Sequence, residues 1–464
     1  MRRTFFFILI VALLGGCSLA PTYTRPEAPV PASWPASSGP QADKTKQAAA
    51  DVPWKEFIVD EKLQKVIGLA LSNNRDLRVA ALNVQRTQAL YRIQRAELLP
   101  SVNAGAVFSK ERVPGILSGS GQPKTTELYN VNVGISQWEI DLFGRIRNLS
   151  DAALEQFFAV EQARASAQIA LVAEVANVYL ALAADRENLK LAQSTLETQQ
   201  ETYEMIRRRA EVGASSDLDL RQAQTRADAA RVDIARYTSQ VALDENALRL
   251  LVGSPVPPEL LPDALDDVAA PRDFTPGLPS EVLQRRPDIL QAEAQLRAAH
   301  ANIGAARAAF FPRIALTTSI GTTSDQLSGL FTSGSETWSF IPQIVMPIFD
   351  ARTWAAYDVT KVDREIALAQ YEKAIQAGFR EVADTLAQRE TLGDQLQAQQ
   401  SLVEASEVGY RLSDARFTRG IDSYLRVLDA QRSLYSAQQG LIVVRLARLA
   451  NLVTLYKVLG GGAL

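Results

Sequence analysis

The chain has 464 residues, of which 47% are hydrophobic and 22% are charged, and its formal net charge is −3. This length allows a large buried core, and the nearly neutral charge gives no electrostatic support for a nucleic-acid partner. One cysteine and one histidine exclude an intrachain disulfide and a His/Cys metal cluster.

Residues 1–16 have the pattern of a secretory signal peptide: two arginines, then an apolar stretch too short to span a membrane. The segment Leu14–Cys17 (LGGC) resembles a bacterial lipobox, and it contains the only cysteine of the chain. We therefore expect cleavage before Cys17 and a lipid on its thiol, which would anchor the mature chain to outer-membrane lipid. Ser18 follows in place of the aspartate that usually retains lipoproteins in the inner membrane, so this resemblance implies the outer membrane.

Two proline-rich segments divide the mature chain. The first, residues 17–53, is expected to be an extended arm. The second, residues 254–279, separates two halves, 54–253 and 280–464, that repeat each other. Matching motifs recur at a nearly constant separation of 206 to 212 residues: Asp76 with Asp288, Pro100 with Pro312, Phe143 with Phe349, and Gly213 with Gly420.

Each half is predicted to contain the same elements in the same order. A helix begins near Asn74, a good N-cap, and its counterpart begins at Pro287, which suits a first helical turn. Stretches with a period of two residues then predict one β-hairpin in each half, at 101–141 and 313–349.

Long helices follow the hairpins. No glycine or proline occurs between Gly144 and Gly213, which allows a helix of roughly 100 Å, and residues 351–419 contain no proline. Helices of this length indicate coiled coils, at 144–252 and 351–459. In each half, the helix before the hairpin and the helix after the glycine turn together nearly equal the long helix in length. They are therefore predicted to stack end to end beside it.

The sequence thus predicts a mainly α fold with a small β part. Charged residues recur along the long helices, so these helices are not expected to cross a bilayer. The apolar hairpins could cross one, but only as part of a closed barrel, and four strands are too few to close. Several copies would then have to contribute. The alternative is a small sheet that caps a soluble helical domain.

Several motifs together resemble one family, the TolC-like outer membrane factors, and most closely its OprM-like efflux lipoprotein branch. The resemblance covers essentially the whole chain and is carried by the stretches 17–23, 74–80, 139–145, 218–224, 285–289, 305–312 and 428–432. It implies a homotrimer in which each protomer gives four strands to a twelve-stranded transmembrane barrel. Its helices would form a periplasmic α-barrel. It also implies a passive duct that exports drugs or other small toxic compounds. A periplasmic membrane-fusion adaptor and an inner-membrane resistance-nodulation-division pump would be its partners.

The resemblance also suggests a gate and its surroundings. Leu425 and Asp429 match ring-forming residues of an OprM-like aperture, and their spacing of four places both on one helix face. Three copies of each would form an apolar ring and a cation-selective ring. The alternative is that Leu425 packs in the coil and Asp429 is solvated. The remaining implied positions are the adaptor-contacting turns Gly213 and Gly420, and a gate network of Asp219, Asp422, Tyr424 and Arg426.

The chain departs from some relatives near the turn at Gly420. Phe417 and Asp422 occupy positions where those relatives tie two coils together through a tyrosine and an arginine, so Arg416, Arg419 or Arg426 could provide the tether instead. The three arginines before the turn at Gly213, residues 207–209, are expected to be a solvated helix end.

We find no catalytic residue set and no phosphate-binding loop, so neither an enzyme activity, a cofactor nor a metal is expected. Two alternatives to small-molecule efflux remain open from the sequence. One is a structural coiled-coil lipoprotein of the envelope, which would not need two apolar hairpins. The other is a duct for type I protein secretion.

Overall fold

The structure, a computed structural model, describes residues 18–31, 33–35, 52–272 and 283–461. The signal peptide and Cys17 therefore lie outside the described residues. The chain forms two compact units. Unit 1 comprises residues 1–27, 83–160 and 291–371, and unit 2 comprises residues 28–82, 161–290 and 372–464.

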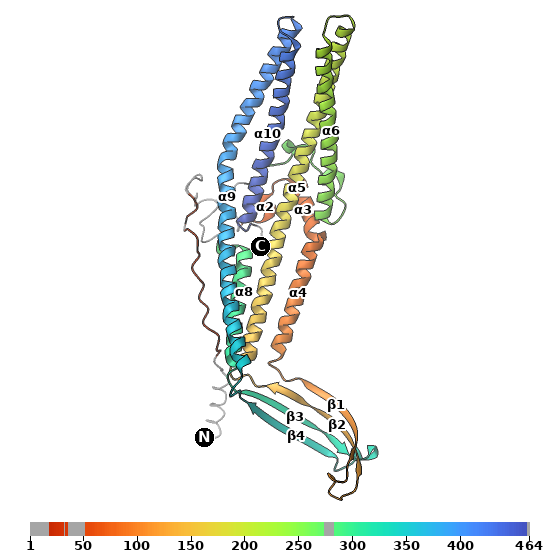
Figure 1. The fold of residues 1–464 in the computed structure, drawn as a ribbon, viewed down its shortest axis with the longest axis vertical. Helices are drawn as coiled ribbons and strands as arrows, with labels where there is room; N and C mark the ends of the chain where they lie inside the picture. Colours follow the sequence, from red (N-terminus) through yellow and green to blue (C-terminus); the bar gives the residue numbers. More distant parts are fainter. Residues whose placement is uncertain (1–17, 32, 36–51, 273–282, 462–464) are drawn as a thin grey trace. The chain divides into compact units, whose positions relative to one another are not determined.

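The described part is mainly helical with one small sheet, which confirms the predicted fold class (Figure 1). The first half contains α2 (Trp54–Phe57), α3 (Glu61–Asn73), α4 (Arg75–Ala96), β1 (Val102–Val113), β2 (Lys124–Glu139), α5 (Arg145–Glu211) and α6 (Asp217–Val252). Two short 3-10 helices follow, η2 (Pro258–Leu260) and η3 (Leu265–Asp267). The second half contains α8 (Pro287–Ala308), β3 (Arg313–Ser324), η4 (Leu327–Gly329), β4 (Glu336–Val345), α9 (Ala351–Thr418) and α10 (Tyr424–Val458).

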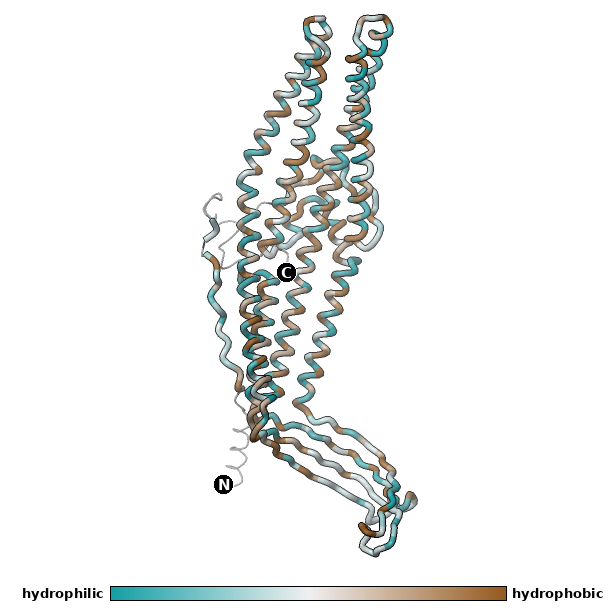
Figure 2. The backbone as a smooth tube through the Cα atoms, viewed as in Figure 1, coloured by the Kyte–Doolittle hydropathy of each residue, from teal (hydrophilic) through white to brown (hydrophobic). Residues whose placement is uncertain are grey.

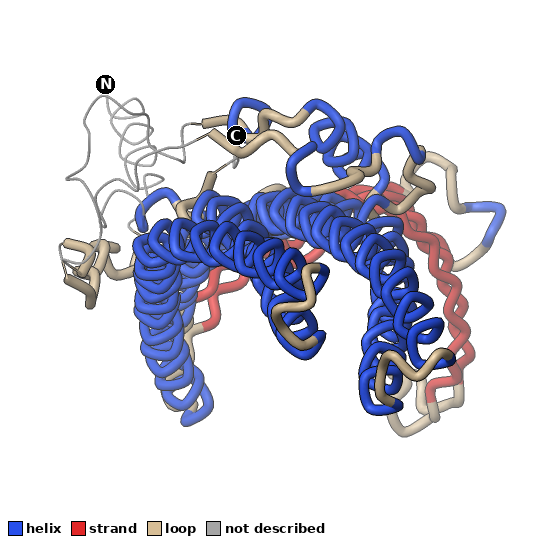
Figure 3. The backbone as a smooth tube through the Cα atoms, turned by 90° about the horizontal axis from the view of Figure 1, so that it is seen from above, coloured by secondary structure: helices blue, strands red, loops and turns tan. Residues whose placement is uncertain are grey.

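The long helices and their turns follow the sequence pattern closely. Helix α5 has 67 residues and α9 has 68, about 100 Å each at the usual rise. The turns that end them contain Gly213 and Gly420, whose φ angles of 70° and 74° lie in the left-handed region that favours glycine. Figure 3 shows the two turns as separate loops at the ends of their helical hairpins. Helices α2 and α3 were not predicted.

The short helices of the first half meet end to end in unit 2, as their lengths predicted. The Asn74 side chain caps α4 by accepting a hydrogen bond from the Leu77 backbone N–H at 2.8 Å. Its Nδ2 donates to the Leu251 carbonyl at the end of α6, also at 2.8 Å. Gly253 allows this close approach, because a Cβ there would lie 2.5 Å from the Asn73 carbonyl oxygen.

Arg286 makes the equivalent joint in the second half. This arginine is buried, and its Nη1 donates to the Val458 carbonyl at the end of α10 at 2.6 Å. Its Nη2 binds Asp288 at 2.7 Å and Glu381 at 2.8 Å. A guanidinium thus satisfies a helix-terminal carbonyl that would otherwise be buried without a donor.

Unit 2 contains the largest hydrophobic core of the described residues, built from α3, α5, α6, α10 and the segments around them. Phe57 stacks on Tyr456 with ring centroids 4.0 Å apart. The most apolar 18-residue window of α5 has a mean hydropathy of 1.6, and 61% of it is buried in the protein. This stretch is therefore apolar because it packs in the core. Figure 2 shows hydrophilic residues interspersed along the rest of the long helices.

In unit 1, the N-terminal arm is clamped onto α8 by one buried carboxylate. Glu293 is 3% exposed and accepts hydrogen bonds from Tyr23 at 3.1 Å and from Arg25 at 3.0 and 2.7 Å. Arg297 donates to the same carboxylate at 2.8 Å. The Tyr23 ring also meets His300 edge-on, so the single histidine packs against the arm.

We predict that Glu293→Gln loosens the arm, because two guanidiniums lose their carboxylate, at a cost of about 2 kcal/mol in docking free energy. Limited proteolysis should then cut the arm at least about tenfold faster. Glu161→Gln, an exposed carboxylate on α5, serves as the control.

The same clamp should depend on pH. Burial opposes ionisation of Glu293, but the hydrogen bonds from Arg25 and Arg297 outweigh it and hold the pKa of this carboxyl below its usual value. The clamp is therefore complete above the ordinary carboxyl pKa and is lost as the pH falls through the lower folded value. An arm that stays equally protected in strong acid would contradict this role.

Candidate functional site

Unit 1 contains a four-stranded antiparallel sheet in the order β1-β2-β3-β4. The central β2–β3 pair joins the two sequence halves. Strands β1 and β4 are therefore the edges, and the outer side of each leaves backbone hydrogen-bonding groups without a partner strand among the described residues.

The strand register sorts the side chains onto two chemically different faces. One face is mainly apolar, although Thr318 and Thr322 also lie on it; its apolar residues are Val102, Ala104, Ala106, Phe108, Tyr129, Val131, Val133, Ile135, Ile314, Leu316, Ile320, Trp338, Phe340 and Ile344. The other face is more polar, with Asn103, Asn130, Asn132, Thr317, Ser319, Thr323, Ser339 and Gln343 beside the aliphatic residues Val107, Leu128, Ala315, Ile341 and Val345. A sheet of this kind can separate lipid on one side from water on the other.

Two glycines on the polar face allow the sheet to bend towards that face. A Cβ on Gly134 would lie 2.3 Å from the Thr318 carbonyl oxygen, and one on Gly321 would lie 2.1 Å from the Val131 carbonyl oxygen. Such close approach of neighbouring strands is the usual effect of glycine at a sharply curved position. Only glycine fits at these two positions, because any side chain would meet the neighbouring backbone.

The apolar row of β1 ends at a charged pair. From Val102 to Phe108 the strand rises roughly 20 Å along its own axis. The tilt of about 40° that is usual in transmembrane barrels would reduce this to roughly 15 Å across a membrane, which is part of their ~25 Å apolar band. Beyond Phe108, an ion pair between Lys110 and Glu127 ends the row.

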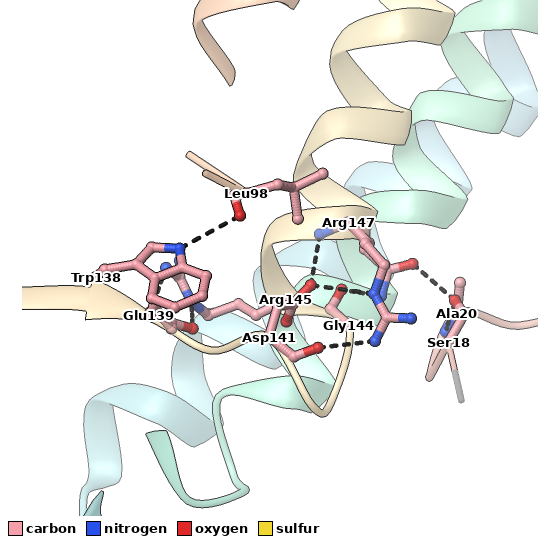
Figure 4. A network of polar contacts seen from close by, with 10 residues as sticks. Ser18, Ala20, Leu98, Trp138, Glu139, Asp141, Gly144, Arg145 and Arg147 are labelled. Atoms are coloured by element: carbon pink, nitrogen blue, oxygen red, sulfur yellow. Dashed lines mark hydrogen bonds and ion pairs between the residues drawn. The ribbon is translucent and has the colours of Figure 1, made fainter. Parts of the chain in front are cut away.

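A polar network holds the base of the sheet to the helices of unit 1 (Figure 4). Glu139 is buried and pairs with Arg145 through two hydrogen bonds of 2.8 and 2.9 Å, and with Arg313 at 2.5 Å. Just before it, a β-bulge contains Gln137, whose φ of 53° is in the left-handed region. The bulge aims Trp138 at the Leu98 carbonyl, to which its indole N–H donates at 3.3 Å.

The start of the described chain joins this network. Ser18 donates to the buried Asn148 side chain at 2.8 Å. Gly304 of α8 leaves room for this segment, because a Cβ there would lie 2.7 Å from the Ala20 nitrogen. The residues that follow Cys17 are therefore fixed beside the base of the sheet.

In unit 2, Leu425 and Asp429 lie on the exposed face of α10. Leu425 is 53% exposed, so it does not pack within a single chain. The Asp429 carboxylate is also exposed and pairs with Arg432 at 3.1 Å, one turn along the same helix. Both side chains are thus on the surface of the single chain, and Asp429 keeps an ion pair with its own helix.

The expected gate network is only partly brought together. Asp422 pairs with Arg416 across the turn between α9 and α10 at 2.5 Å, so this ion pair lies within one hairpin and does not tie two hairpins together. Asp219 instead caps α6, where its carboxylate accepts from the Ser216 hydroxyl at 2.7 Å. Arg426 is exposed.

The two helical hairpins contact each other through a small apolar cluster that the sequence did not predict. Tyr424, Val427 and Leu428 of α10 are buried with Ile206 of α5 and Ala223 of α6, and burial raises the pKa of Tyr424 to about 12. This cluster is where α10 meets the first hairpin.

Arg209 adds a polar contact to the cluster. Its guanidinium lies 5.4 Å from the centre of the Phe417 ring, within the range of a cation–π interaction. Arg209 had been grouped with two neighbours as a solvated helix end, which holds for Arg207, paired with Glu204 on the surface of α5. The sequence contained one signal for this contact. Phe417 replaces the tyrosine of some relatives, and its ring can interact with a guanidinium although it has no hydroxyl.

Comparison with known proteins identifies the family. The profile of the outer membrane efflux protein family matches residues 66–254 and 278–461. The antibiotic efflux pump outer membrane protein ArpC of Pseudomonas putida and the toluene efflux pump outer membrane protein TtgC of Pseudomonas putida are each 49% identical over 467 residues, covering 100% of this chain and 96% of theirs.

The fold has solved counterparts as well. The open state of the MtrE outer membrane channel of Neisseria gonorrhoeae matches with a TM-score of 0.88 and 38% identity, covering 96% of this chain and 99% of that one. The family profile spans both halves of the sequence, and the relatives align along their whole length. The chain belongs to the outer membrane efflux protein family.

Proposed function

We propose that three copies of this chain assemble into one passive exit duct for drugs or other small toxic compounds. The observation that carries this proposal is the sheet of unit 1, which has a mainly apolar face, a more polar face and two edge strands that pair with no further strand among the described residues. In lipid every backbone N–H and C=O must find a partner, so such a sheet needs neighbours on both edges. Three copies supply twelve strands, within the range of closed transmembrane barrels.

The internal repeat provides the template for the joint between copies. Val102 pairs with Ile135 in the first hairpin as Ile314 pairs with Ile344 in the second, so the two hairpins correspond in register. Within the chain, Ile135 of β2 pairs with Thr318 of β3. The corresponding contact between copies places Ile344 of β4 opposite Ala106 of β1 in the next copy, with both residues on the apolar face.

The same correspondence applies at the base of the sheet. Phe143 stacks on Phe311 within the chain, with ring centroids 4.8 Å apart. The equivalent positions in the other half are Phe349 and Leu99, and these are 89% and 71% exposed. The apolar contact between Phe143 and Phe311 forms within each chain, whereas the equivalent residues Phe349 and Leu99 remain exposed. This is expected if Phe349 of one copy packs on Leu99 of the next.

The helices of unit 1 leave matching surfaces uncovered. Leu90 and Ile93 are exposed on α4, and Val359, Val362 and Ile366 are exposed on α9. Their spacings of three and four residues place each set on one helical stripe. These stripes favour helix packing between copies, which would continue the barrel as a helical tunnel.

A passive duct needs partner proteins, because it cannot itself drive transport. An inner-membrane resistance-nodulation-division pump would drive export, and a periplasmic adaptor would meet the turns at Gly213 and Gly420. Small-molecule cargo is favoured over secreted protein because two relatives with 49% identity are named for toluene and antibiotic efflux.

The gate would lie on α10. Three copies of Leu425 and Asp429 would form two rings one turn apart, the first closing the pore by dewetting and the second favouring cations. In the closed state, the Arg209–Phe417 contact would hold α9 against the first hairpin, and the cluster around Tyr424 would hold α10 against it. The lipid on Cys17 would lie beside the base of the sheet, because Ser18 is fixed there.

The lipid anchor is tested by Cys17→Ser. This variant should lose all labelling by a radioactive fatty acid, because the chain has no other cysteine. It should still reach the membrane, since the barrel is held there by its own apolar face. Labelling that persists in the variant would refute the lipid anchor.

The assembly is tested by cross-linking. Ile344→Cys combined with Ala106→Cys should give covalent trimers with a short bifunctional thiol reagent, because the two positions face each other between copies. Ile344→Cys combined with Val107→Cys is the matched control, since residue 107 points to the opposite face and should react poorly. A mass measurement in detergent that finds a stable folded monomer would contradict the shared barrel.

The gate is tested by Leu425→Ala combined with Asp429→Ala. Removing the apolar ring and the carboxylate ring should raise the resting single-channel conductance at least about twofold and lower the preference for monovalent cations. Cells carrying this variant should admit large polar antibiotics.

The control for the gate is Leu218→Ala combined with Asp228→Ala. It removes an equally exposed leucine and an aspartate paired to an arginine three residues on, both from α6. If the gate variant forms trimers yet conducts like the unmodified channel, the constriction lies elsewhere on the inner helices.

A further inference from the structure

The contact between α5 and α6 in unit 2 brings together two carboxyl groups. Asp244 of α6 is only 9% exposed. Asp185 of α5 is half-buried, and its carboxyl lies within hydrogen-bonding reach of Asp244. Two carboxylates at this distance repel each other, so the pair needs a compensating charge.

The two carboxylate oxygens of Asp244 differ in their hydrogen bonding, and the oxygen without a donor shows where the compensating charge is needed. Gln240 donates from Nε2 to Asp244 Oδ1 at 3.1 Å. Asp244 Oδ2 is buried and has no hydrogen-bond donor among the described residues, apart from what Asp185 can offer. Buried polar atoms are nearly always hydrogen-bonded, and a carboxyl group can donate only when it is protonated. Asp185 therefore fits as the donor to Oδ2 when it carries a proton.

The neighbouring cations are engaged by other groups. Arg236 of α6 acts on Asp185, but it is held by Asp233 at 3.1 Å and by the Tyr237 hydroxyl at 3.0 Å. Arg186, next to Asp185 on α5, pairs with Glu245 at 2.7 Å.

Charged and titratable groups on the other packed elements are also engaged elsewhere. On α10, Arg445 pairs with Glu187 of α5 at 2.8 Å, and the Tyr435 hydroxyl donates to Asp233. Helix α3 approaches α6 at the far end, near Leu251. A proton is therefore the simplest compensating charge for the pair.

We propose that Asp185 and Asp244 form a proton-binding site that fastens α5 to α6 while one proton is shared and loosens this contact when the proton leaves. Burial, together with the hydrogen bond and charge of Asp244, raises the pKa of Asp185 from 3.8 to about 7. The stabilising effect is thus full below the ordinary carboxyl pKa and is lost as the pH rises through about 7.

The site can influence the gate through α6. About three turns before Asp244, Asp233 accepts from Tyr435 of α10 at 2.9 Å, and about two turns before Asp244, Tyr237 accepts from Gln439 of α10 at 3.2 Å. Movement of α6 at the carboxyl pair would shift these contacts, and α10 carries Leu425 and Asp429. This second step rests on the proposed function, whereas the proton site does not.

The site is tested by hydrogen exchange of α5 and α6 peptides in the purified protein from pH 5 to pH 9, after correction for intrinsic rates. If opening releases one proton, the local opening constant should rise up to about tenfold per pH unit and level off above about pH 7. Asp185→Asn should abolish this dependence, because its amide donates to Asp244 Oδ2 at every pH. Asp228→Asn, an exposed aspartate on α6, should leave it unchanged.

Infrared spectroscopy of the unmodified protein gives a second measurement that needs no variant. A protonated carboxylic acid band present at pH 6 and absent at pH 8.5 is expected. Exchange and infrared signals that do not change with pH would overturn the site. So would protection at constant pH that follows the sodium concentration, since the pair would then bind a cation and not a proton.

The link to the gate is tested separately, by single-channel conductance over the same pH range. The unmodified channel should open more often as the pH rises through about 7, and the Asp185→Asn channel should not. If exchange follows pH but conductance does not, the proton site stands and its coupling to the proposed gate fails.

Discussion

The unpaired edges of the four-stranded sheet are the constraint on which the rest of the molecule depends. Strands β1 and β4 have apolar side chains on one face and unsatisfied backbone groups along their outer edges. Water can form hydrogen bonds with such backbone groups and lipid cannot. In a membrane, the edge strands would therefore be stable only if they paired with further strands. The apolar face favours lipid, and edges without partner strands would be costly there, which is why we propose that further copies of the chain pair with them.

The duplicated sequence explains how copies of one chain could supply partner strands for each other. Each chain contains the contact between its two halves once, as in the Phe143–Phe311 stack. Each also leaves the corresponding residues, Phe349 and Leu99, exposed. A repeat that packs on its own partner within a chain can pack on the next chain in the same way, and the series closes when its rotations sum to a full turn.

Buried charges in both units act at joints between segments. Glu293 holds the arm to α8, Arg286 joins α8 to the end of α10, and Glu139 ties the sheet to α5. Each is matched by opposite charges or carbonyls, because an unpaired buried charge would be costly. Asp185 and Asp244 differ in that two carboxyl groups meet, so the contact proposed between them weakens as the pH rises, whereas the Glu293 clamp weakens as the pH falls.

The sequence alone determined the elements that depend on local backbone chemistry. The cap at Asn74, the helix start at Pro287 and the glycine turns at 213 and 420 lie where predicted, because each depends on the conformational preference of a residue and its close neighbours. The hairpins followed from a two-residue period, and the stacked helices followed from their lengths. Family resemblance directed attention to Leu425 and Asp429, whose exposure the structure then described.

Only the tertiary structure decided which distant side chains meet. Arg209 and Phe417 are on different hairpins, and Asp185 and Asp244 are on different helices. Glu293 receives its partners from an arm more than 260 residues earlier in the chain. Helical period defines a face of each helix but not the rotation and axial shift at which two helices pack. A displacement of one turn would replace every one of these contacts, so local patterns cannot specify them.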